Sequence, residues 1–89
     1  MIQRTVLFSG RVQGVGFRYT TCRIAARYRV AGYVRNLADG RVEAVIEGKE
    51  PIIEEFVHAL SDEMSGYIRD MQHKDGIPTG TFAGFEIRL

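Results

Sequence analysis

The order of hydrophobic patterns along the 89-residue chain restricts its possible folds more than any other feature. Some segments alternate apolar and polar side chains, as strands with one buried face do, and others repeat apolar side chains at helical spacing. The predicted strands are 5–9, 33–37, 41–47, a weaker one at 67–73 and a short one at 85–89. The predicted helices are 17–29 and a second that starts at Pro51 and ends near Ser61.

This order, β-α-β-β-α-β with one further terminal strand, predicts an α+β fold. Two interlocked β-α-β units would place both helices on one face of an antiparallel sheet, and right-handed crossovers leave few other arrangements. A composition that is 45% hydrophobic and 26% charged is typical of globular proteins and argues against disorder. We expect a single domain over residues 1–89, because a chain of this length is rarely divided.

The same patterns predict the core and the turns. Apolar positions on the predicted strand 41–47 form its buried face: Val42, Ala44 and Ile46. One side of the first helix gathers five residues that we expect to pack inward: Phe17, Thr21, Ile24, Ala25 and Tyr28. Asp39 and Gly40 provide a two-residue hairpin turn, and a turn containing Pro78 is expected at 75–80.

A glycine-rich run connects the first predicted strand to the first predicted helix. Three glycines fall within residues 10–16, and Arg18 follows at the start of the helix. A strand, a glycine-rich turn and a helix N-terminus can direct backbone N–H groups at phosphate oxygens, and Arg18 adds a planar pair of donors. The pattern alone leaves open whether the loop binds phosphate or only connects two elements. It lacks the Lys-Ser/Thr ending of the nucleotide-binding P-loop, which disfavours a nucleoside triphosphatase.

Two longer motifs contain these residues. Residues 10–18 read GRVQGVGFR, and residues 32–36 read GYVRN, followed at fixed intervals by Gly40, Val42 and Gly48. The first motif resembles the first signature of the acylphosphatase family along its whole length, and the second resembles the other signature of that family. The resemblance implies a ferredoxin-like fold over essentially the whole chain. It also implies hydrolysis of a carboxyl-phosphate anhydride to a carboxylate and inorganic phosphate, without a metal or another cofactor.

The resemblance also implies roles for individual residues. Arg18 matches the phosphate-binding arginine of the family and Asn36 matches the asparagine that orients water. The residues expected to hold the substrate phosphate, or a phosphate or sulfate ion in its place, are Gln13, Gly14, Val15, Gly16, Phe17 and Arg18. Gly16 stands where some members carry an aromatic residue, which could alter the stiffness of the loop.

Other residues capable of chemistry are better explained by ordinary structural roles. Cys22 follows the loop instead of preceding it, unlike the nucleophile of cysteine-dependent phosphatases, so we expect a partly buried thiol. His58 and Asp62 are four residues apart on the second helix but have no third ligand nearby in the motifs, so we expect a solvated face and no metal. We expect His73 to lie on the surface and Asp39 to serve its turn.

Charge and composition shape the expected partners and location. The formal net charge of +1 is too small to create a positive electrostatic potential that would attract nucleic acid or an anionic membrane. A single cysteine excludes an intramolecular disulfide, and no apolar run is long enough for a signal or a membrane span. We therefore expect a cytoplasmic protein. We also expect a monomer, and the resemblance implies that its partner is a small acyl phosphate.

Three alternatives stay open. An RNA-binding module shares the element order, but residues 41–47 carry no stacking aromatic side chain and include two acids. A domain acting on carbamoyl phosphate, as in large hydrogenase-maturation proteins, would use the same loop. The fold could also be present without activity.

Overall fold

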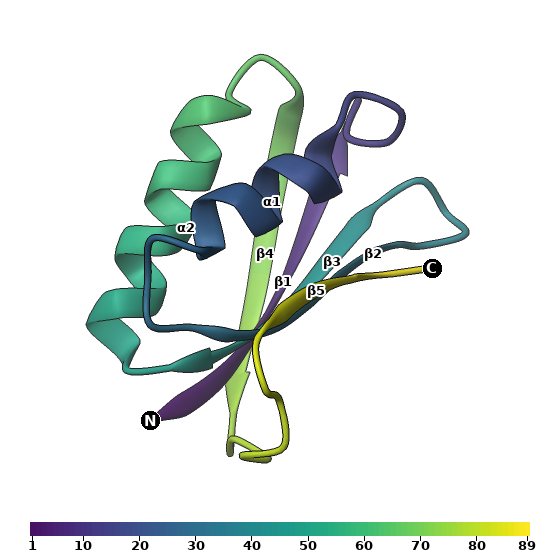
Figure 1. The fold of residues 1–89 in the computed structure, drawn as a ribbon. Helices are drawn as coiled ribbons and strands as arrows, with labels where there is room; N and C mark the ends of the chain where they lie inside the picture. Colours follow the sequence, from purple (N-terminus) through teal and green to yellow (C-terminus); the bar gives the residue numbers. More distant parts are fainter.

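A computed structural model describes all 89 residues as a five-stranded sheet with two helices (Figure 1). The elements are β1 (Ile2–Gly10), α1 (Phe17–Ala25), β2 (Ala31–Asn36), β3 (Val42–Gly48), α2 (Glu50–Glu63), β4 (Ile68–Gly76) and β5 (Phe85–Arg88). The predicted β-α-β-β-α-β order with a short additional strand is confirmed, as is the ferredoxin-like arrangement of two helices on a sheet.

The sheet is mixed, with the strand order β4-β1-β3-β2-β5. The first four strands pair antiparallel as predicted, but β5 pairs in parallel with β2, placing Phe85 beside Gly32 and Ile87 beside Val34. β4 and β5 lie at opposite edges of the sheet. The chain crosses from one edge to the other after β4 and then runs through β5 in the same direction as β2, so these two strands pair in parallel (Figure 1).

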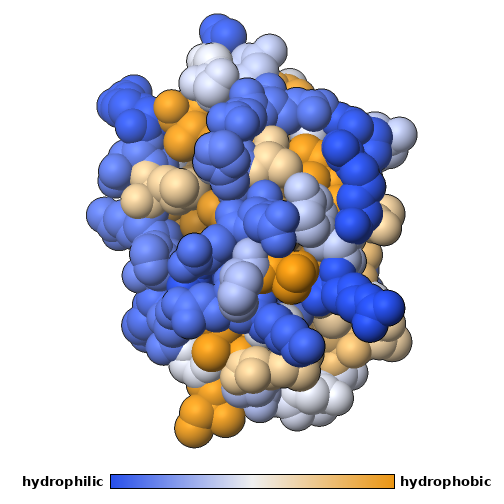
Figure 2. Space-filling model, turned by 90° about the vertical axis from the view of Figure 1, so that its left-hand side faces the viewer, coloured by the Kyte–Doolittle hydropathy of each residue, from blue (hydrophilic) through white to orange (hydrophobic).

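The core lies between the sheet and the helices. Val42, Ala44 and Ile46 are completely buried, so the predicted inner face of β3 is confirmed. Four of the five side chains predicted on α1 are buried as well: Phe17, Thr21, Ile24 and Ala25. Tyr28 is only partly buried, and its ring lies 6.0 Å from that of Phe56 on α2. The side of the molecule on which α2 lies is mainly hydrophilic, with small, separate hydrophobic patches (Figure 2).

Several predicted boundaries were wrong: β1 begins at Ile2 instead of residue 5, β2 begins at Ala31 instead of residue 33, and the first helix and β4 end at other residues than predicted. The first helix ends at Ala25 instead of residue 29. The N–H groups that follow donate to acceptors three residues back in the chain, Arg27 N–H to Ile24 O and Tyr28 N–H to Ala25 O, both at 3.0 Å. These three-residue spacings tighten the chain out of the α-helix. β4 continues to Gly76 instead of ending at residue 73, so the expected turn at 75–80 begins later.

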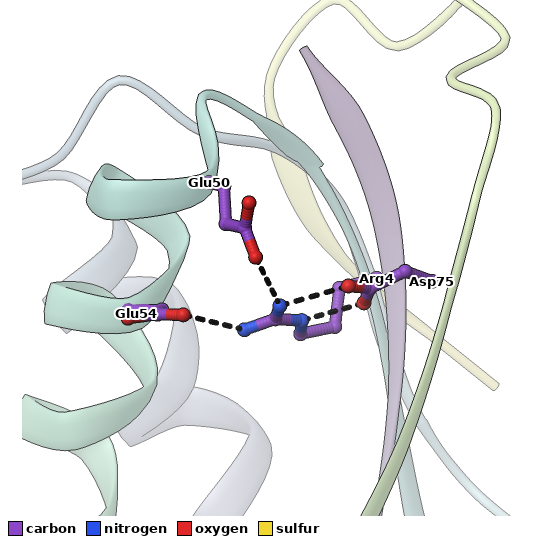
Figure 3. Close-up of polar contacts among 4 residues, drawn as sticks. All are labelled: Arg4, Glu50, Glu54 and Asp75. Atoms are coloured by element: carbon purple, nitrogen blue, oxygen red, sulfur yellow. Dashed lines mark hydrogen bonds and ion pairs between the residues drawn. The ribbon is translucent and has the colours of Figure 1, made fainter.

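The end of β4 is held by the buried side chain of Arg4 (Figure 3). Arg4 is 7% exposed and forms two bonds to the Asp75 carboxylate, from Nε at 2.7 Å and from Nη2 at 2.9 Å. Its guanidinium also lies 3.4 Å from Glu50 and 3.9 Å from Glu54. The cluster joins β1, β4 and α2, and the hydrogen bond from Arg4 lowers the pKa of Asp75.

A second buried charge fixes the loop between β4 and β5. The carboxylate of Glu47 accepts hydrogen bonds from the Gln3 side chain (2.7 Å), from the N–H and hydroxyl of Thr79 (2.7 and 2.9 Å), and from the N–H of Gly80 (3.0 Å). Burial raises the pKa of Glu47, but these donors outweigh it and the net shift is downward. The loop therefore has a fixed anchor on β3 before β5 begins.

Candidate active site

The loop between β1 and α1 depends on two glycines in the left-handed region. Gly14 and Gly16 each have φ of 77°, a conformation that is costly for residues with a Cβ. Gly16 is the N-cap of α1 and provides no side-chain cap. The N–H groups of the first helical turn have no intrahelical acceptor, so they can bind an anion.

A cleft of about 180 Å³ opens beside this loop. It brings together three parts of the chain that are distant in sequence: the loop with the start of α1, the end of β2, and β5. The residues that line it are Val12, Gly14, Gly16, Phe17, Arg18, Tyr19, Asn36 and Ile87. The structure thus places Arg18 and Asn36, the two residues expected to act in catalysis, in one cleft.

Arg18 stands on the first turn of α1, and its side chain is oriented by β5. Its Nη1 donates a hydrogen bond to the main-chain carbonyl oxygen of Arg88 at 3.3 Å. A guanidinium has five N–H donors, so one such bond leaves the others available for an anion. The bond to Arg88 therefore orients the Arg18 side chain and leaves its other N–H donors available for an anion.

Asn36 is the last residue of β2 and precedes the β2–β3 hairpin. Leu37 N–H bonds Arg41 O at 2.8 Å, and Asp39 accepts from Arg41 N–H at 3.1 Å, as expected of a turn aspartate. Asn36 is partly exposed and lines the cleft. Its carboxamide can donate and accept at once, which suits it to hold a water molecule.

Gln13 has a different position from that of the other predicted phosphate ligands. Its side-chain Nε2 donates to the carbonyl oxygens of Leu37 and Arg41, at 2.8 and 2.9 Å. Neither Gln13 nor Val15 lines the cleft, whereas Gly14, Gly16 and Arg18 do, together with Phe17. The Gln13 side chain therefore attaches the loop to the hairpin that follows Asn36.

Sequence reasoning missed two lining residues, Tyr19 and Ile87. Val12 and Phe17 belong to the motif that was expected to hold phosphate, and both line the cleft while being buried, at 1% and 2% exposure. Tyr19 and Ile87 are 68% and 44% exposed. An available signal was that Tyr19 is a large aromatic residue outside the apolar stripe of α1. No local signal in the sequence brings Ile87 to the loop, because its position depends on the parallel pairing of β5.

The remaining candidates lie outside the cleft. His58 Nδ1 and Asp62 Oδ2 are 3.8 Å apart on the exposed side of α2, and no group of three or more His, Cys, Asp or Glu side chains gathers anywhere in the protein. Cys22 is half-buried, and burial together with the Glu86 carboxylate raises the pKa of its thiol. His73 is exposed.

Neither helix has the length and apolar character needed to cross a membrane.

The fold and the cleft define a ferredoxin-like α+β protein with a strand–loop–helix site suited to an oxyanion. The family model described as Acylphosphatase matches residues 4–87, so the chain belongs to the acylphosphatase family. An acylphosphatase of Trichormus variabilis is 43% identical over 89 residues, which cover 99% of this chain and 87% of that relative.

Solved structures show the same similarity. The crystal structure of acylphosphatase from Bacillus subtilis superimposes with a TM-score of 0.89 at 33% identity, covering 100% of both chains. The crystal structure of T. kodakarensis HypF matches with a TM-score of 0.85 at 34% identity, covering 100% of this chain but 12% of that one.

Proposed function

We propose that the protein is an acylphosphatase that hydrolyses the carboxyl-phosphate bond of acyl phosphates, giving a carboxylate and inorganic phosphate. The observation that carries the proposal is the convergence of Arg18, Asn36 and the glycine-rich loop on one cleft. The similarity to proteins named acylphosphatase supports the same activity.

Phosphate binding is assigned to the loop and Arg18. Backbone N–H groups over about residues 15–18 and the positive end of α1 surround the phosphoryl oxygens. Charge spreads over three equatorial oxygens during phosphoryl transfer, and a guanidinium with several N–H donors can stabilise that charge. Arg18 is the one charged residue lining the cleft, so it carries most of this task.

Asn36 is assigned to the nucleophilic water. A carboxamide cannot act as a strong base, but it can hold water in line with the bond to be broken. The carboxylate of an acyl phosphate is a good leaving group, so the reaction needs no strong acid from the enzyme. The substrate phosphate accepts the proton of the attacking water in this scheme.

The reaction is proposed to need no metal, because Arg18 and the helix N-terminus supply the positive charge that a metal would otherwise provide. The test is phosphate release from benzoyl phosphate in excess EDTA. We expect the rate to be unchanged by EDTA and to fall about 10²–10³-fold in Asn36→Ala. The matched control is Gln72→Ala, which removes an exposed carboxamide from β4. A rate that EDTA abolishes, or an Asn36→Ala rate equal to that of wild type, would contradict the mechanism.

We also propose that the protein acts as a cytoplasmic monomer that binds no nucleic acid. Tyr33, on the sheet face opposite the helices, is the aromatic residue best placed to stack a base. The Arg88 guanidinium lies 4.1 Å from its ring centroid, and Arg35 beside it pairs with Glu43 at 2.7 Å. This covered, partly acidic face is unsuited to RNA. Light scattering would test the monomeric state, and an RNA gel shift at low salt would test the absence of nucleic-acid binding.

A further inference from the structure

The cleft has an apolar side in addition to its anion-binding side. Of its four apolar lining residues, Val12 and Phe17 are buried in the core and offer little surface to a ligand. Tyr19 and Ile87 also line the cleft but are exposed. These two side chains are therefore the apolar surface that a bound molecule can reach.

We propose that Tyr19 and Ile87 form a binding site for the acyl group, and that the preferred substrates are acyl phosphates with an apolar acyl group, such as benzoyl phosphate. This inference rests on the proposed acylphosphatase function. When the phosphate lies against Arg18 and the loop, the acyl group must lie among the lining residues that remain. Those residues are Tyr19, Ile87 and Asn36, and Asn36 is assigned to the attacking water, which leaves Tyr19 and Ile87 for the acyl group.

Both side chains are attached to well-anchored backbone. Tyr19 directly follows Arg18 on the first turn of α1, and Ile87 lies beside Val34 in the parallel β2–β5 pairing. β5 is fixed further by the bond between Arg18 and Arg88 O. An acyl group would therefore meet a surface that exists before it binds, and little additional ordering is needed.

The charges around the cleft argue against a second anionic group on the substrate. Arg18 is the one charged lining residue, and the phosphate occupies it. The Arg88 guanidinium is directed to the aromatic rings of Tyr33 and Phe82, at 4.1 and 5.7 Å from their centroids. An acyl group that carries a carboxylate or a second phosphate would have no second cation in the cleft to pair with. An apolar acyl group would instead gain from the removal of its surface from water.

The test compares kcat/KM for benzoyl phosphate and acetyl phosphate in wild type, Tyr19→Ser, Ile87→Ala and Tyr19→Phe. Wild type should favour benzoyl phosphate. The benzoyl-to-acetyl ratio should fall roughly 5- to 20-fold in Tyr19→Ser and in Ile87→Ala, mainly through KM, because apolar contacts of this size discriminate to that extent. Tyr19→Phe should retain the wild-type ratio. The control is Ile77→Ala, which removes an 89% exposed side chain outside the cleft.

The outcomes separate this proposal from the function on which it rests. If wild type hydrolyses both substrates but the variants keep the wild-type ratio, the acyl site is overturned and the acylphosphatase function stands. If wild type favours acetyl phosphate over benzoyl phosphate, the acyl site is likewise overturned and the acylphosphatase function stands. If wild type releases phosphate from neither substrate, both proposals are overturned.

Discussion

Arg18 and Arg88 are joined by a hydrogen bond from a guanidinium to a main-chain carbonyl oxygen, 3.3 Å long. The bond connects the first turn of α1 to β5, which itself pairs with the strand that ends at Asn36. The two residues assigned to catalysis are therefore positioned partly through the same edge strand.

Replacing Arg18 by lysine should retain the charge but lose the planar pair of donors and the bond to Arg88. We expect kcat/KM to fall about 10²–10³-fold, with weaker inhibition by inorganic phosphate, because lysine binds phosphate as a point charge. Steady-state kinetics and phosphate inhibition measure both effects. Arg69→Lys, on the exposed face of β4, is the control and should behave as wild type.

Replacing Asn36 by aspartate should impair both catalysis and anion binding. The new carboxylate would repel the phosphoryl oxygens, so kcat should fall about 10²–10³-fold and phosphate inhibition should weaken at pH 7. Asn36→Ala should lower kcat similarly yet leave phosphate inhibition nearly unchanged. Equal phosphate inhibition in the two variants would argue that Asn36 lies away from the anion.

Replacing Gly16 by alanine should disturb the loop through backbone strain alone. A Cβ at Gly16 would meet no atom within 4 Å, but φ is 77°, so the left-handed conformation would cost about 1 kcal/mol. We expect weaker phosphate inhibition with a small loss of stability. Gly66→Ala, where space is equally open and φ is not positive, should change neither.

Replacing Asp75 by asparagine should destabilise the protein, because the buried Arg4 loses the charged partner to which it donates two hydrogen bonds. The folded-state pKa of Asp75 is lowered by Arg4, so the pair stabilises the fold above the unfolded pKa near 4. That contribution disappears as the pH falls through the lower folded pKa. Urea unfolding from pH 7 to pH 2 should show a flatter profile in Asp75→Asn than in wild type. Asp70→Asn is the exposed control.

Replacing Glu47 by glutamine should loosen the loop that leads into β5. The NH2 group of glutamine would replace one of the two carboxylate oxygens, either the one that accepts from Thr79 or the one that accepts from Gly80. The donors at that position would lose their acceptor, so we expect a loss of about 1–3 kcal/mol. The pKa of Glu47 is lowered in the fold, so this contribution too is present at neutral pH and lost on acidification. Hydrogen exchange should increase first in residues 77–88. Unchanged exchange there would mean that other contacts hold the loop.

The sequence predicted those parts of the fold that have a strong local pattern. Alternation located β1 and β3, and the apolar stripe of α1 identified its buried face. The length of β4 was underestimated, since its side chains are mostly exposed and its end is fixed by Arg4, far away in sequence. The parallel pairing of β5 was also missed, because a four-residue strand carries no information about its partner.

The site shows the same division. Arg18 and Asn36 were predicted from motifs, and the structure brings them to one cleft, although their chemical roles stay proposals. The side-chain bonds of Gln13 to the hairpin and the place of Ile87 depend on contacts between distant segments. Local sequence patterns cannot reveal such contacts.

The joining of α1, β2 and β5 at the cleft has a consequence for folding. Residues near positions 16, 36 and 87 must meet before the cleft exists, so its assembly requires loops to close across most of the chain. Closing long loops before any contact is gained slows folding. In a refolding experiment, enzymatic activity should therefore recover later than the circular dichroism signal of the helices. The time at which activity returns would then mark the docking of β5 on β2.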